Sequence, residues 1–329
     1  MPDKNGVDGV IVVIRATFNV ISDGVVVSED QMPVVRADEY WDAPENSSLK
    51  YASEISLPKP ATDIVMIGHA RSPDNRPVKD LNVGLKVGNT LKVVKVFGDR
   101  HWKKTIGMES IEGPKPFVKM PLIYEKAFGG IDVHRSDEKK KEYDPRNPVG
   151  SGFVMSGGRK EIDGLKLPNI EDPHHLIKSP QDRPKPAGFG YIAPSWKPRH
   201  EYAGTYDKKW GKTKAPFLPD DFEDRFLNCA NPDLIASGYL NGNEDVAIRN
   251  AGKESQIQFR LPKLDFQVFY IIEEDVLLQT PNLDTLIVEP DEMRFSMIWR
   301  AMQPCDKKIS KIHTVGLQCI SSNIELPGK

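Results

Sequence analysis

Cysteine is scarce in this sequence, and its few copies are poorly placed for a structural role. The chain of 329 residues has three cysteines, Cys229, Cys305 and Cys319, and no two of them form a CxxC pair. An odd number of widely spaced cysteines argues against a disulfide framework and against a zinc site built on thiolates. The pattern is typical of a protein in a reducing compartment.

Long apolar runs and a strong net charge are also missing. No stretch approaches the roughly 20 apolar residues that cross a bilayer. The apolar run at residues 9–14 is too short for a signal peptide and ends at Arg15. We therefore expect a cytoplasmic protein with no membrane partner. A net charge of −2 lacks the basic excess of nucleic-acid binding proteins, so no nucleic-acid partner is expected.

Motifs of the commoner catalytic and cofactor sites are absent as well. The sequence has no GxSxG and no GxxxxGK[ST] phosphate loop. Its EDPHH run, which ends at His174 and His175, gathers metal-ligand types, but adjacent histidines in an extended loop point in opposite directions. We predict no catalytic residue, no metal, no cofactor and no small-molecule substrate.

Period-two alternation at both ends of the chain predicts a mainly β protein of about a dozen strands. Residues 10–20 are rich in β-branched side chains and lead into a turn at residues 22–24. Residues 81–97 predict a hairpin closed by Gly88 and Asn89. The apolar phase slips by one position near Val93–Val94, so we predict a β-bulge there.

The C-terminal part predicts further antiparallel strands, including a hairpin around an EPDE turn at residues 289–292. We expect antiparallel sheets arranged as a sandwich or as two β lobes. The chain is divided into an N-terminal β lobe at 1–113, a loop-rich region at 114–240 and a C-terminal β lobe at 241–329.

The loop-rich region combines proline, glycine and aromatic residues. Disordered tracts are poor in aromatics, so we predict ordered loops. One short helix is predicted near 220–230, because Asp220 or Asp221 would cap it and acidic residues fill its first turn.

Residues 187–211, AGFGYIAPSWKPRHEYAGTYDKKWG, form an aromatic stretch that allows several interpretations. Its aromatics could bind a sugar beside the Asp220–Asp221 carboxylates of a hydrolase. They could stack on nucleic-acid bases. Tryptophan and arginine could instead pack on each other as a structural clasp. Lastly, Trp, Tyr and Arg are the residues enriched at protein-interface hot spots.

Motifs that occur in order along nearly the whole chain favour one of these interpretations of residues 187–211. They include RATF (15–18), MPLIYEKAFGG (120–130), NPVGSGF (147–153), DRPKPAGFGYIAPSWKPRHEYAGTYDKKW (182–210) and PFLPDDFEDRFLNCANPDL (216–234). Together they resemble a bacterial family first catalogued as a domain of unknown function, whose genes lie beside type VI secretion VgrG spikes and PAAR-like tip proteins. The resemblance implies an adaptor or chaperone that loads a PAAR-like effector onto VgrG and stays in the cytoplasm. It implies no catalytic residues.

On this interpretation, Trp196, Arg199, Tyr206 and Trp210 lie at or just beneath the surface that binds the effector. A rigid surface favours binding because no loop has to be ordered on association. Strand addition to an exposed sheet edge is a second expected mode. A carbohydrate-active hydrolase built on residues 196–221 and a structural component of the secretion apparatus remain the alternatives.

Overall fold

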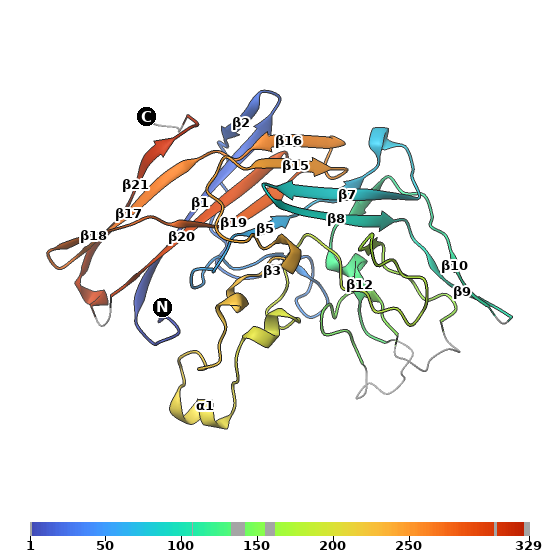
Figure 1. The fold of residues 1–329 in the computed structure, drawn as a ribbon, viewed down its shortest axis with the longest axis horizontal. Helices are drawn as coiled ribbons and strands as arrows, with labels where there is room; N and C mark the ends of the chain where they lie inside the picture. Colours follow the sequence, from blue (N-terminus) through green and yellow to red (C-terminus); the bar gives the residue numbers. More distant parts are fainter. Residues whose placement is uncertain (1, 107, 133–141, 155–161, 306–307, 326–329) are drawn as a thin grey trace.

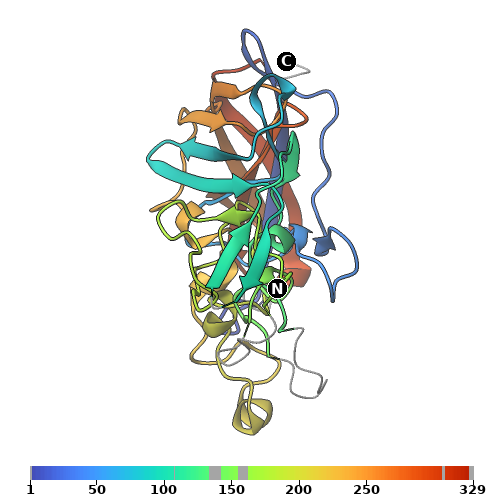
Figure 2. The same cartoon turned by 90° about the vertical axis from the view of Figure 1, so that its right-hand side faces the viewer.

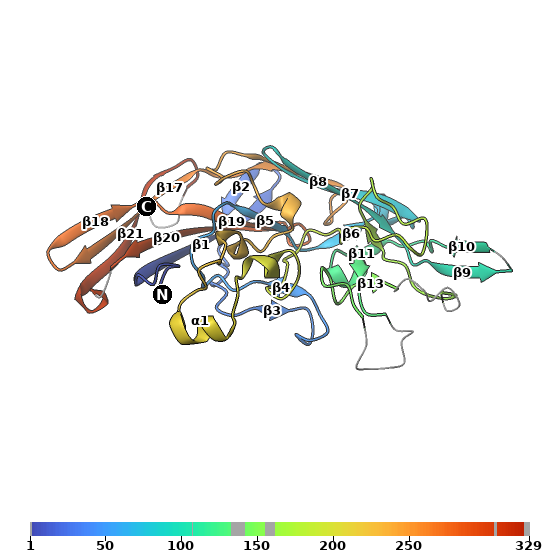
Figure 3. The same ribbon diagram turned by 60° about the horizontal axis from the view of Figure 1, so that its bottom comes forward.

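Antiparallel sheets dominate the structure, which confirms the mainly β fold class (Figure 1). The computed structural model describes residues 2–106, 108–132, 142–154, 162–305 and 308–325. Two five-stranded sheets form the centre, and a three-stranded sheet and a β-hairpin extend at opposite ends (Figure 3). Within the described residues, no helix is long and apolar enough to span a membrane.

The first sheet joins strands from the two ends of the chain. Its order is β2 (Gly24–Val27), β1 (Gly9–Ile21), β20 (Arg294–Pro304), β19 (Asn282–Glu289) and β5 (Asp63–Met66). β1 pairs antiparallel with β20 from Gly9 to Asn19, and β5 runs parallel to β19. The turns expected near residues 22–24 and 289–292 both close hairpins.

The second sheet packs face to face on the first. Its order is β14 (Ile170–Glu171), β8 (Thr90–Phe97), β7 (Asp80–Val87), β15 (Asp245–Arg249) and β16 (Gln256–Arg260). Phe259 of β16 stacks on Phe295 of β20 with ring centroids 4.8 Å apart, and Phe295 stacks on Phe18 of β1 at 5.1 Å. Buried apolar side chains of both sheets extend this aromatic column into one core, which holds the two layers together.

A third sheet and short strand pairs complete the described β-structure. The third sheet has the order β18 (Asp275–Gln279), β17 (Leu264–Ile272) and β21 (Ile312–Ser322). Val268 and Tyr270 of β17 join Ala301 of β20 in a smaller buried cluster, which attaches this sheet to the first one. The pairs are β3 (Glu39–Tyr40) with β4 (Leu49–Tyr51), β6 (His69–Arg71) with β11 (Lys119–Pro121), β9 (His101–Thr105) with β10 (Met108–Glu112), and β12 (Phe128–Gly129) with β13 (Ser151–Gly152).

The β-bulge predicted near Val93–Val94 is wrong. β7 and β8 pair in one continuous register around their two-residue turn. Alternation along β8 places Lys92 and Val94 inward, whereas Leu91 and Val93 face outward. The apolar phase slips because a lysine occupies an inward position, where its ammonium lies 2.6 Å from a carboxylate oxygen of Asp233.

Near 220–230, where a short helix is predicted, the structure has a 3-10 helix at Asp224–Leu227 with Glu223 at its N-cap, so the predicted cap at Asp220 or Asp221 is wrong. Asp221, expected to cap that helix, accepts hydrogen bonds from Thr205 instead. The described α-helix is α1 (Lys208–Thr213), which lies in the region where the sequence predicts ordered loops. Other 3-10 turns are at Pro73–Asn75, Tyr124–Lys126, Arg199–Tyr202, Pro232–Leu234 and Ile309–Lys311.

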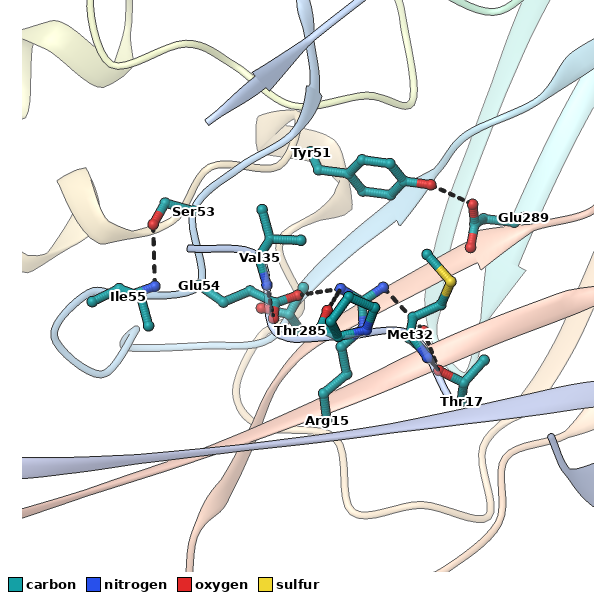
Figure 4. A network of polar contacts seen from close by, with 12 residues as sticks. Arg15, Thr17, Met32, Val35, Tyr51, Ser53, Glu54, Ile55, Thr285 and Glu289 are labelled. Atoms are coloured by element: carbon teal, nitrogen blue, oxygen red, sulfur yellow. Dashed lines mark hydrogen bonds and ion pairs between the residues drawn. The ribbon is translucent and has the colours of Figure 1, made fainter. Parts of the chain in front are cut away.

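Buried charges tie the segment that precedes β5 to the first sheet (Figure 4). Arg15 of β1 lies 3.0 Å from a carboxylate oxygen of Glu54, which also accepts the N–H of Val35 at 3.0 Å. Tyr51 of β4 donates its hydroxyl hydrogen to Glu289 of β19. A buried carboxylate without donors would cost several kcal/mol, so these pairings fix where the segment can lie.

Candidate partner-binding site

Trp196 and Arg199 hold the first half of the aromatic stretch against the body of the protein. Trp196 is 5% exposed, and its indole meets the ring of Tyr124 edge-on with centroids 5.6 Å apart. The guanidinium of Arg199 donates to the carbonyl oxygens of Ile192 at 2.8 Å and Phe226 at 2.9 Å. It also lies 5.0 Å from the centre of the Phe226 ring, a cation–π distance. We call Trp196 and Arg199, with these contacts, the clasp.

The clasp supports one wall of a pocket of about 370 Å³, which we call the proline pocket. Its lining residues are Arg146, Lys185, Pro186, Ile192, Lys197, Pro198, Glu201, Asn231, Pro232 and Asp233. The clasp acts on this lining directly, because Arg199 bonds the carbonyl of Ile192 and Trp196 precedes Lys197 and Pro198 in the chain. Proline fixes the backbone φ, so these walls have little freedom to lose when a ligand enters.

The rim of the proline pocket is charged. Lys197 pairs with Glu201 at 2.8 Å, and Nε of Arg146 donates to Asp144 at 2.9 Å. Lys185 is exposed at the same rim. An apolar interior with a charged rim is the arrangement that accepts an anchoring side chain from another protein.

The second half of the aromatic stretch leaves the body of the protein as an arm, residues 203–219, with α1 at its tip (Figures 1 and 2). Tyr206 is 53% exposed and packs edge-on against Trp210 with ring centroids 4.7 Å apart. Nε1 of Trp210 donates to the carbonyl of Phe217 at 2.9 Å. The arm therefore displays an ordered aromatic pair to solvent. Around that pair it carries the lysines Lys208, Lys209, Lys212 and Lys214.

Asp221 closes the base of the arm. Its carboxylate accepts the N–H of Thr205 at 2.9 Å and the hydroxyl of Thr205 at 2.7 Å. Gly204 precedes this contact with a φ of +80°, and a Cβ there would lie 2.9 Å from Asp221 Oδ1 and from Pro219 Cβ. The turn thus requires glycine, since a side chain would be strained and crowded.

The carboxylates beside the arm do not form an acid–base pair. Hydrogen bonds from the side chain and backbone of Thr205 lower the pKa of Asp221. Asp220 lies 2.7 Å from the ammonium of Lys214 and is exposed. A glycosidase acid needs a raised pKa, usually from an apolar pocket, so this geometry gives no support to hydrolysis at residues 196–221.

A buried lysine, aspartate and cysteine meet in the core, but their chemistry is structural. Nζ of Lys59 lies 2.8 Å from Asp63 Oδ2, and Sγ of Cys229 lies 3.2 Å from the same oxygen. Burial raises the pKa of the Cys229 thiol to about 11. The group is therefore a thiol near neutral pH and a poor nucleophile. The ion pair joins the loop of Cys229 to β5.

The EDPHH run divides between the interior and the surface. Glu171 is 1% exposed and pairs with Arg100. Asp172 accepts the N–H of His174 at 2.9 Å and lies 3.1 Å from Nδ1 of the exposed His175. No group of three or more His, Cys, Asp or Glu side chains in the described part of the chain is arranged to hold a metal ion.

The four residues singled out from the sequence thus lie in two places. Trp196 and Arg199 lie beneath the lining of the proline pocket, and Tyr206 and Trp210 pair on the arm. Sequence reasoning missed the turn at Asn231–Asp233, which lines the pocket from a distant segment. Its Asn-Pro dipeptide is a turn signal and was the available clue.

Residues 5–300 match the family described as uncharacterized protein conserved in bacteria (DUF2169). The chain belongs to this family. The match includes the proline pocket and the arm and ends within β20. The DUF2169 description names no activity and no partner, so the match confirms only that the chain belongs to a conserved bacterial family of unknown function. No curated protein and no solved structure matches the chain.

Proposed function

We propose that this protein is a type VI secretion adaptor that binds a PAAR-like effector and assists its loading onto the VgrG spike. The proposal rests on the motif resemblance and on one structural observation, the packing of the exposed Tyr206 on the half-buried Trp210 on an ordered arm. Aromatic side chains displayed in a fixed geometry bury much area at little entropic cost when a partner covers them. A hydrolase is less favoured, because Asp220 and Asp221 are each held by other groups.

The surplus of lysine on the arm indicates which part of a partner it contacts. Lys208, Lys209 and Lys212 lie in α1 with Trp210, against Asp207 at the start of the helix, whereas Lys214 is paired with Asp220. Complementary charge would raise the association rate with an acidic surface and make that rate fall with salt. The proline pocket would then accept an anchoring side chain from the same partner.

The test is a pull-down with tagged protein from the native bacterium, with the captured proteins identified by mass spectrometry. We expect a PAAR-like effector, with or without VgrG, and a loss of capture for Tyr206→Ala. Tyr143→Ala is a matched control, because Tyr143 is also 53% exposed but lies outside the arm. Failure to recover any effector in cells that express it would contradict the adaptor proposal. Accumulation of the protein in secreted material would instead favour a structural component.

A further inference from the structure

One edge of the second sheet is only partly paired. β7 lies along the whole length of β8 on one side. On the other side β14 pairs with Lys95 and Val96 alone, and among the described residues no strand lies beside the part of β8 before them. The first half of β8 is therefore an unpaired edge of an open sheet, whose opposite edge strand is β16.

The register shows which backbone groups this free edge exposes. In a hairpin with a two-residue turn, the residues that flank the turn exchange both hydrogen bonds, and such pairs then alternate along the strands. Thr90, Lys92 and Val94 consequently bond to β7, so the N–H and C=O groups of Leu91 and Val93 point away from it. Neither of these two residues has a hydrogen-bond partner on that side within the described residues.

β14 stops short of this edge for local reasons. Pro173 has no N–H to donate opposite Val93, so it cannot continue the ladder. Asp172 accepts the N–H of His174 at 2.9 Å, which starts a turn away from β8. Glu171 accepts the N–H of Ile177 at 2.8 Å, so the segment after β14 folds back onto Glu171 and does not continue as a strand. The space that a longer β14 would fill is left open.

That space is a groove of about 700 Å³, which we call the edge groove. Leu91 is 61% exposed and Val93 is 37% exposed along it. Its lining residues are Asn89, Thr90, Leu91, Lys92, Val93, Asp172, His174, Ala187, Pro232, Asp233, Ile235 and Ser237. Pro232 and Asp233 also line the proline pocket, so the two sites adjoin.

We propose that the edge groove binds an extended segment of the partner protein, which adds to β8 as a strand at Leu91 and Val93. This step rests on the proposed adaptor function for the identity of the partner. The chemistry of the groove defines the segment. The bound segment has no proline at the positions that pair with β8, and its apolar side chains lie over Leu91 and Val93. The segment also carries a basic residue. The groove lining has two carboxylates, Asp172 and Asp233, and one ammonium, that of Lys92, so its net charge is negative.

A substitution of one residue separates backbone pairing from side-chain packing. Val93→Pro removes the N–H that points into the groove, leaves every bond to β7 intact and is of a kind that edge strands tolerate. Val93→Thr is the matched control, because it is β-branched and keeps the N–H. Leu91→Pro repeats the test one pair along the edge. Thermal unfolding of each variant establishes that it is folded.

The first probe is a fluorescent peptide of alternating threonine and valine with a lysine at each end, measured by anisotropy. We expect the wild-type protein and Val93→Thr to bind it, and Val93→Pro to bind about tenfold more weakly because a paired carbonyl loses its donor. Backbone N-methylation of the peptide should abolish binding. No binding to the wild type at ~1 mM peptide, or equal binding to Val93→Pro, would overturn the proposal.

The second measurement is the effector pull-down repeated with Val93→Pro. Loss of the effector with this variant, and retention with Val93→Thr, places the effector strand on β8. Equal capture by both variants overturns the edge groove while the adaptor function stands. If the wild type captures no effector, the adaptor function fails, and the peptide result alone decides whether this edge binds a strand. Self-association that Val93→Pro abolishes would assign the edge to a second copy and overturn the partner assignment.

Discussion

The two halves of the aromatic stretch, which share a composition, have opposite surroundings. Trp196 packs on Tyr124, a residue of a distant loop, and is almost fully buried. Trp210 finds its contacts inside the arm, on Tyr206 and on the carbonyl of Phe217. The first half is therefore fixed by long-range contacts and the second by local ones. Identical residue types serve the core in one half and display a surface in the other.

The clasp and the arm are both rigid, but their rigidity has different structural causes and different consequences. The clasp holds part of the proline pocket in place, because Arg199 donates a hydrogen bond to the carbonyl of Ile192, a lining residue. The arm is ordered by its own contacts, by Asp221 at its base and by Phe217 against Gly6 near the N-terminus, so it needs little from the core. Substitutions in the clasp should act on stability first and on binding as a consequence. Substitutions in the arm should act mainly on binding and change the free energy of unfolding little.

The largest effect should follow Trp196→Ala. Removal of a buried indole leaves a cavity beside Tyr124 and should lower the free energy of unfolding by ~3–5 kcal/mol. Urea unfolding followed by intrinsic fluorescence measures it. A loss of less than ~1 kcal/mol in the free energy of unfolding would show that neighbouring side chains fill the cavity. The clasp would then differ little from the arm in its effect on stability.

Arg199→Lys should come next, although it keeps the charge. A lysine ammonium cannot reproduce the fork that bonds the carbonyls of Ile192 and Phe226, so one carbonyl loses its donor. We expect a loss of about 2 kcal/mol in the free energy of unfolding. Hydrogen exchange should also rise at Ile192 and across the lining of the proline pocket. Unchanged hydrogen exchange in the pocket lining would mean that the clasp does not stabilise the proline pocket.

The β-strands were predictable from sequence because their alternation is local. The hairpins around residues 22–24, 88–89 and 289–292 form where turn signals interrupt alternating runs. The bulge error at Val93–Val94 came from treating apolar as inward. Lys92 points inward because Asp233, far along the chain, neutralises it, and no local pattern contains that partner. The pairing of β1 with β20 is equally non-local.

The helix error has the same origin. Asp221 is a good acceptor for backbone N–H groups, which made it a plausible helix cap, but Thr205 across the base of the arm supplies the donors. The residue types at the candidate site were therefore readable, whereas their division into clasp and arm was not. That division depends on Tyr124 and Phe226, which reach Trp196 and Arg199 from other loops.

The arm should give small stability effects and a large binding effect. Tyr206→Ala should change the free energy of unfolding by less than ~0.5 kcal/mol, and Trp210→Ala by about 1 kcal/mol. Each should weaken effector capture at least about tenfold, as hot-spot residues do. Tyr143→Ala is the control for an exposed tyrosine elsewhere. Full effector capture by both arm variants would mean that the arm does not contact the effector and that the contact surface lies in the clasp half.

The smallest effect is a pH response of the base of the arm. Thr205 lowers the pKa of Asp221 in the folded arm, so the folded state binds that proton less readily than the unfolded state. The anchoring contribution is therefore complete above the ordinary aspartate pKa of 3.8 and is lost as the pH falls through the lowered value. The amide signal of Thr205, followed by NMR, should titrate with a midpoint below 3.8. Asp221→Asn should abolish that titration and leave the indole signal of Trp196 unchanged, because the clasp contacts contain no carboxylate. A midpoint at or above the ordinary value would mean that Asp221 does not hold the arm, and the arm would then depend on the core as the clasp does.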